Sequence, residues 1–122
     1  MALRLAGALL LLTVSISCGS SSTTPPSSPT PTPGSTPVSI VSGSRTLTTT
    51  AYAPNPVNIA MGGSLTWTNN DTIAHTATDN NGGWDSGSIA PGGQFTRTFP
   101  TAGTFGYRCT IHPNMVGTVN VQ

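Results

Sequence analysis

Residues 105–119 read FGYRCTIHPNMVGTV. Apolar and polar positions alternate up to Cys109, which predicts a β-strand with Phe105, Tyr107 and Cys109 on its inner face. The chain must then turn back, because a second alternating run follows directly. The short loop between these two strands is expected to bring together three side chains that bind soft metals: Cys109, His112 and Met115.

The rest of the chain after Pro37 also predicts strands. Valine, isoleucine, leucine and tryptophan alternate with polar residues, and no stretch keeps the spacing of a helix. Inner faces are predicted from Val57 with Ile59, from Leu65 with Trp67 and, if no bulge intervenes, from Ile73 with His75 and Ala77. Glycine-rich turns separate the strands, at residues 61–63, 81–83 and 91–93. These patterns indicate an all-β fold, a β-sandwich of about seven to eight strands.

Two positions leave alternatives open. Arg97 falls in phase with the apolar Phe95 and Phe99, so either a β-bulge intervenes or the guanidinium extends to solvent at a sheet edge. Trp84 suits either the core or the surface.

Charge is scarce along the whole chain of 122 residues. There are four Lys and Arg and three Asp and Glu, which amounts to 6% charged residues. If Arg4 is removed with a signal peptide, three arginines and three aspartates remain and the net charge is zero. Such a surface does not attract nucleic acid, so we expect no nucleic-acid partner.

The first 37 residues predict export and attachment. Arg4 precedes a short apolar run, which favours a signal peptide over residues 1–17 and is too short to span a bilayer. The sequence SISC at 15–18 resembles a bacterial lipobox, which would make Cys18 a lipidated N-terminus; conventional cleavage after Ser17 is the alternative. Residues 18–37 contain six of the 11 prolines and read as a Pro/Ser/Thr-rich tether. The globular domain is predicted over residues 38–122.

The second cysteine raises the alternative of a disulfide bond. An exported protein can form one between Cys18 and Cys109. A lipidated Cys18 has no thiol, however, and the bond would join a tether to a core strand. Metal coordination explains a solitary Cys109 better.

A fourth candidate ligand lies upstream, because the chain has only two histidines and the first is His75. Taken singly, His75, Cys109 and Met115 would each suit an ordinary core. Taken together, two imidazoles, a thiolate and a thioether match the donor set of a mononuclear copper site. Zinc fits less well, since thioether is not among its usual ligands.

With these motifs, the sequence resembles the cupredoxin (blue copper) family of the plastocyanin/azurin type, and its ligand loop is most like that of amicyanin. The resemblance rests on Cys-x2-His-x2-Met with Pro113, on Met-x-Gly-x-Val, on Asp-x3-His before the first ligand, and on Leu-Thr-Trp at 65–67. It implies a Greek-key β-sandwich with one type 1 copper ion. It also implies His75, Cys109 and His112 as equatorial ligands and Met115 as the axial ligand.

One residue departs from the family pattern. Thr76 stands where many relatives carry asparagine, whose side chain hydrogen-bonds to the ligand loop. The Thr76 hydroxyl is expected to replace at most part of that bond.

The resemblance implies one-electron transfer outside the cytoplasm. Neither an open coordination position nor a nucleophile with a separate base is evident, so we expect no enzyme. We expect a monomer that is lipid-anchored to a membrane through Cys18. Redox partner proteins would dock on an apolar patch around His112, Pro113 and Met61, with the turn at 91–93 nearby. A copper carrier or sensor of the cell envelope remains the alternative function. A weaker third reading is an adhesive β-sandwich in which copper only stabilises the fold.

Overall fold

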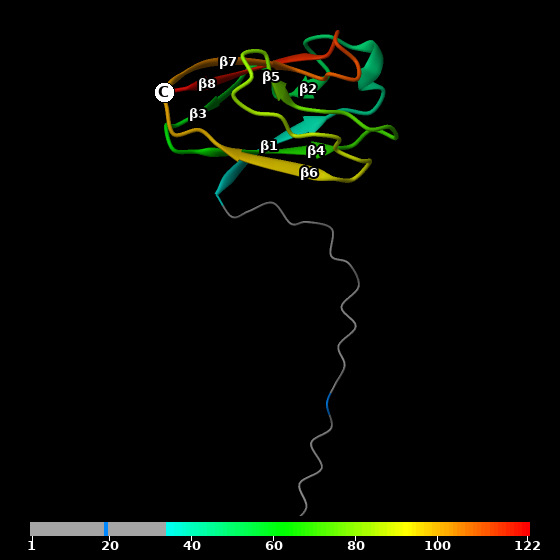
Figure 1. The fold of residues 1–122 in the computed structure, drawn as a ribbon, viewed down its shortest axis with the longest axis horizontal. Coiled ribbons are helices and arrows are strands. Elements are labelled where there is room, and N and C mark those ends of the chain that lie inside the picture. Colours follow the sequence, from blue (N-terminus) through cyan, green and yellow to red (C-terminus); the bar gives the residue numbers. More distant parts are fainter. Residues whose placement is uncertain (1–18, 20–33) are drawn as a thin grey trace, which may run out of the picture.

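The structure is a computed structural model that describes residue 19 and residues 34–122. It forms two four-stranded sheets that face each other, with strand orders β2-β1-β4-β6 and β3-β8-β7-β5 (Figure 1). The predicted signal peptide, Cys18 and most of the predicted tether lie outside the described residues. Within the described residues, no helix is long and apolar enough to cross a membrane.

The described part of the chain has eight short strands and one 3-10 helix, η1. In chain order the elements are β1 (Ser35–Ile40), η1 (Ser44–Thr46), β2 (Tyr52–Ala53), β3 (Val57–Ile59), β4 (Ser64–Asn69), β5 (Thr78–Asp79), β6 (Gln94–Thr98), β7 (Gly103–Arg108) and β8 (Val116–Val121). The prediction of an all-β sandwich with seven to eight strands is confirmed. The first strand begins at Ser35, three residues before the predicted domain start at residue 38.

Strand directions give the sandwich two distinct ends. β1 runs parallel to β4, and β3 runs parallel to β8, whereas β7 and β8 are antiparallel neighbours. The end of the sandwich at which β4 and β7 finish is called the site end. The opposite end, at which β1, β4 and β7 begin, is called the far end. The chain enters β1 at the far end, and the loop between β7 and β8 lies at the site end (Figure 1).

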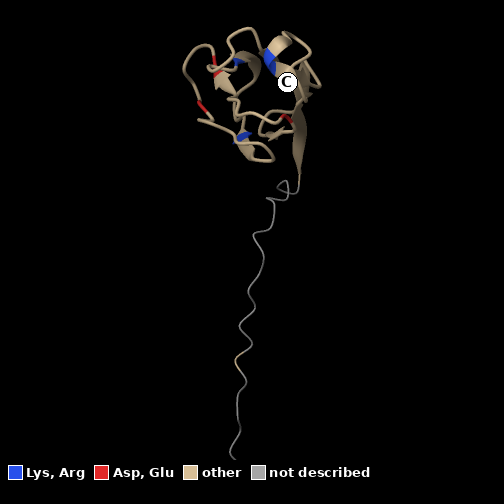
Figure 2. Ribbon diagram, turned by 90° about the vertical axis from the view of Figure 1, so that its right-hand side faces the viewer, with Lys and Arg blue, Asp and Glu red and all other residues tan. Residues whose placement is uncertain are grey.

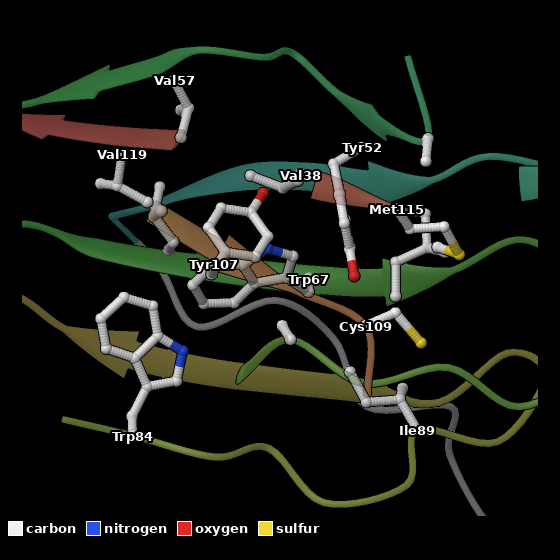
Figure 3. Packing of buried hydrophobic residues seen from close by; sticks show 14 of the residues in the cluster. Val38, Tyr52, Val57, Trp67, Trp84, Ile89, Tyr107, Cys109, Met115 and Val119 are labelled. Atoms are coloured by element: carbon white, nitrogen blue, oxygen red, sulfur yellow. The ribbon is translucent and has the colours of Figure 1, made fainter. Parts of the chain in front are cut away.

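The core between the sheets is aromatic. Trp67 of β4 packs edge-on against Tyr107 of β7, with ring centroids 5.4 Å apart, and both side chains are buried. Trp84 is also a core residue: it packs on the Phe99 ring at 5.3 Å and lies on the same side of the cluster as β6 (Figure 3). β8 can approach Tyr107 only because residue 117 is glycine, since a Cβ there would collide with the Tyr107 ring.

The structure decides between the two explanations for Arg97. β4 and β6 pair without interruption from Ser64↔Thr98 to Thr68↔Gln94, so the strand has no bulge. β6 is an edge strand, and the Arg97 guanidinium carbon lies 4.8 Å from the centroid of the Trp84 ring. The charged end therefore extends over an aromatic surface at the sheet edge, which gives it a cation–π contact.

The predicted strand with Ile73, His75 and Ala77 on one face is wrong. This segment is irregular, and His75 makes only an isolated bridge to Ile89, with N–H···O contacts of 3.2 and 2.8 Å. The next backbone N–H, that of Thr76, points to the sulfur of Cys109 at 3.3 Å. A backbone donor used for a side-chain sulfur cannot also extend a strand ladder, which explains the departure from the alternating pattern.

Candidate metal centre

Cys109 directly follows β7 at the site end and is fully buried. Its backbone N–H donates to the Met115 carbonyl at 3.0 Å, and the Met115 N–H donates to the His112 carbonyl at 3.0 Å. These two bonds close the seven-residue loop onto itself. The loop therefore presents its sulfur and its imidazole to the same space, as the sequence predicts.

His75 reaches this space from the segment between β4 and β5. Its side chain is fully buried, and the paired contacts with Ile89 fix its backbone. His112 is partly exposed, so one edge of its ring reaches the surface.

The three predicted equatorial ligand atoms form a compact triangle. Cys109 Sγ lies 3.9 Å from His75 Nδ1 and 3.8 Å from His112 Nδ1, and the two Nδ1 atoms are 3.2 Å apart. A point equidistant from three atoms at these separations lies about 2.1 Å from each, which matches metal–nitrogen bonds and is slightly shorter than metal–sulfur bonds. His75, Cys109 and His112 are therefore positioned to bind one metal ion.

The Cys109 sulfur has one backbone donor, the Thr76 N–H at 3.3 Å. The orientation of Thr76 is fixed from its other side, because the buried Tyr52 hydroxyl donates to the Thr76 carbonyl at 2.6 Å. Burial, helped by the neighbouring Cys109, raises the pKa of Tyr52 well above its usual value, so the phenol stays protonated and remains a donor.

The Thr76 hydroxyl also bridges to the ligand loop. Thr110 N–H donates to Thr76 Oγ1 at 2.9 Å, and the Thr110 hydroxyl lies 3.2 Å from the same oxygen. Thr76 thus bonds across to the ligand loop, as was expected in part of its hydroxyl.

The second nitrogen of His75 faces away from the triangle, toward Asp71 and Ser44. Nε2 lies 2.9 Å from Asp71 Oδ2 and 3.1 Å from Ser44 Oγ. Hydrogen bonds to the Asp71 carboxylate hold its pKa well below the usual range. The bond from the Gly43 N–H has the largest effect, and His75 and other donors add to it. The sequence indicated Asp71 only as the aspartate of Asp-x3-His, and the contribution of Ser44 from η1 has no local sequence signal.

Met115, the predicted axial ligand, is fully buried. Its side chain lies at the same end of the core as Cys109 (Figure 3). Its backbone is fixed by the two hydrogen bonds that close the loop.

The predicted docking residues do not all lie at the site end. Pro113 is exposed next to His112, and Asn69 at the end of β4 bonds to Gly92 and Gly93, which places that turn at the site end. Met61 is at the far end, because its N–H donates to the carbonyl of Gln122, beyond the end of β8. The five steps along β8 separate the two ends by about 17 Å. The prediction that Met61 borders His112 is therefore wrong.

Sequence reasoning missed an exposed apolar residue in the ligand loop. Ile111 is 49% exposed and directly precedes His112. The sequence could have predicted its exposure, because Ile111 lies between Cys109 and His112 in a loop, where no core is available to bury it.

The fold and the site together define a class: small β-sandwich proteins that bind one copper ion through two imidazoles and a thiolate. The profile described as copper binding proteins, plastocyanin/azurin family, matches residues 39–122. The chain belongs to this family.

Individual relatives agree with the assignment. The chain is 33% identical over 84 residues to plastocyanin of Scenedesmus fuscus, covering 58% of this chain and 86% of the relative. It is 36% identical over 84 residues to chloroplastic plastocyanin of Tetradesmus obliquus, covering 58% of each protein.

Solved structures show the same fold. A purple cupredoxin from Nitrosopumilus maritimus superposes with a TM-score of 0.65 and 30% identity, covering 70% of this chain and 98% of the other. A reduced Cu(I) form of an amicyanin variant at pH 4 superposes with a TM-score of 0.61 and 25% identity, covering 73% of this chain and 83% of the other.

Proposed function

We propose that this protein carries single electrons between redox partners outside the cytoplasm, at one type 1 copper ion held by His75, Cys109 and His112. The observation that carries the proposal is the triangle of ligand atoms, with sides of 3.2–3.9 Å. When bound, copper supplies the one-electron change between Cu(II) and Cu(I). The protein supplies ligand positions that are fixed by backbone hydrogen bonds, which limits the movement that accompanies each electron.

Met115 is proposed as the fourth, axial ligand. A buried thioether beside the thiolate suits a weak axial bond and disfavours harder metals. With Met115 in that position the site has no open place for a substrate. We therefore propose a carrier and not an enzyme.

Partners are proposed to dock over His112. Its ring is partly exposed, and Ile111 and Pro113 beside it are exposed apolar residues. Charged residues are few, and they lie at separate places along the ribbon of the domain (Figure 2). A small apolar contact around an exposed ligand edge suits the short-lived encounters of redox proteins.

We also propose that Cys18 carries a lipid and that the mature protein is a membrane-tethered monomer. Support comes from the lipobox-like SISC and from the position where the domain starts. β1 begins at the far end, so the chain enters the domain at the end opposite His112 (Figure 1). Replacing Cys18 with serine should move the protein from the membrane fraction to the soluble fraction, and unchanged membrane association would contradict lipidation.

The central experiment is to add Cu(II) to the purified metal-free chain. We expect an intense visible thiolate-to-copper band, saturating at one copper per chain, and reversible voltammetry. Cys109→Ser should abolish the band. Thr118→Ser, a conservative change in β8, serves as the control and should keep it. Absence of the band in the folded protein would refute the proposal, whereas a band with rapid Cu(I) loss to an acceptor protein and irreversible voltammetry would favour a copper carrier.

A further inference from the structure

Asp71 is a buried carboxylate that lies next to His75 of the candidate metal site. Its side chain is 5% exposed, and Oδ2 lies 2.9 Å from His75 Nε2 in a fully buried contact. Among the residues that the structure describes, this is the one contact within 4 Å between a carboxylate and a basic side chain. The Asp71 carboxylate therefore acts on His75 without a competing arginine in contact.

Four donors fix the position of this carboxylate. Oδ1 accepts from the Gly43 N–H at 3.0 Å and the Thr72 N–H at 2.8 Å, and Oδ2 accepts from the Ser44 hydroxyl at 3.2 Å as well as from His75. An ionised carboxylate has only acceptor sites, so His75 Nε2 must carry the hydrogen. The lone pair of neutral His75 then lies on Nδ1, the atom that faces Cys109 and His112.

The same contact has an electrostatic consequence for a bound ion. A hydrogen bond to a carboxylate makes the imidazole a stronger donor to the metal. Stronger donation, together with a nearby negative charge in a buried site, stabilises the ion of higher charge more than the ion of lower charge.

We propose that Asp71 is a positioning residue that fixes His75 with its Nδ1 lone pair toward the metal and biases bound copper toward Cu(II), which lowers the reduction potential. This inference rests on the proposed function, because it needs copper at the triangle. It assigns a role that differs from ligation, since Asp71 touches only the outer edge of His75.

The test compares Asp71→Asn with Asp85→Asn, which removes the same formal charge from an exposed residue. For Asp71→Asn we expect the ratio of Cu(II) affinity to Cu(I) affinity to fall at least tenfold, which is an upward potential shift of about 59 mV or more for one electron. Asp85→Asn should change the ratio less than twofold. An unchanged or lowered potential in Asp71→Asn, or equal shifts in both variants, would overturn the proposal.

Ser44→Ala separates the charge from the hydrogen-bond network. It removes one donor to Asp71 Oδ2 and keeps the carboxylate, so the affinity ratio should change less than in Asp71→Asn. A shift as large as that of Asp71→Asn would overturn the electrostatic part of the proposal.

A metal-free measurement keeps the inference testable if Asp71→Asn does not fold. Nitrogen-15 NMR of the wild-type apoprotein at pH 8 should show His75 with its proton on Nε2, and a proton on Nδ1 would overturn the assignment. The proposed function fails separately: a wild-type chain that forms no charge-transfer band with copper refutes electron transfer, while the His75 tautomer still reports on Asp71.

Discussion

Thr76→Val is the sharpest test of how the segment that carries His75 is held to the ligand loop at 109–115. Valine keeps the shape of threonine and leaves the backbone N–H of residue 76 free to donate to Cys109 Sγ. It removes the hydroxyl that accepts from Thr110 N–H at 2.9 Å and contacts the Thr78 hydroxyl at 2.9 Å. The Thr110 backbone donor loses its partner at a part-buried position.

The expected cost follows from that unpaired donor. Leaving a buried donor unsatisfied costs about 1–3 kcal/mol, and partial access to water places this case at about 1–2 kcal/mol. For a domain of this size each kcal/mol lowers the Tm by about 4–8 °C. We therefore expect the metal-free variant to melt several degrees below wild type, with urea unfolding giving the same loss.

Thr78→Val is the matched control for this measurement. Thr78 is only partly buried, and its hydroxyl contacts the Thr76 hydroxyl and the exposed Asp85 carboxylate, which water can replace. Its loss should stay within about 0.5 kcal/mol. If Thr76→Val costs no more than Thr78→Val, then the Thr76 bond does not hold the ligand loop and our interpretation of the asparagine replacement is wrong.

Three further outcomes are expected. Gly117→Ala should lower the free energy of unfolding by about 1–3 kcal/mol, because its Cβ meets the Tyr107 ring, while Gly19→Ala, with open space around it, should have no effect. Stopped-flow association with a redox partner should depend weakly on ionic strength, since residues 38–122 hold three arginines and three aspartates and so carry no net charge; a steep fall of the association rate with salt would contradict this. The pKa of Asp71 is depressed in the folded chain. The ionised carboxylate therefore stabilises the fold in full above the unfolded pKa near 4, and this stabilisation is lost as the pH falls further. Between pH 6 and pH 3, the free energy of unfolding in urea should fall less in Asp71→Asn than in wild type.

Local sequence was sufficient for the ligand loop and for most strands. Cys109, His112 and Met115 lie within seven residues, so a single strand–turn–strand prediction places them together. The inner faces of β3 and β8 follow from strict alternation of buried and more exposed residues. The apolar residues of β4 also mark its inner face, although Thr66 between them is buried as well.

The failures occur where long-range contacts replace the strand ladder. Residues 73–77 alternate like a strand, yet Thr76 donates to Cys109, 33 residues away. Met61 precedes a glycine pair much like the turn at 91–93, and only the pairing of β3 with β8 shows that it lies at the far end. Neither fact is encoded within a window of neighbouring residues.

The same distinction explains which parts of the site the sequence could not supply. Ser44 reaches the ligand His75 across 31 positions of the chain, and Tyr52 reaches Thr76 across 24, so neither leaves a local signal. Asp71 lies only four residues before His75, but the motif Asp-x3-His does not show that its carboxylate contacts Nε2. Ligand identity is therefore local, whereas ligand orientation depends on the tertiary fold. Because electron transfer favours ligands that move little between oxidation states, we expect its rate to depend on these orienting contacts. The Thr76 and Asp71 variants change the contacts without changing a single ligand.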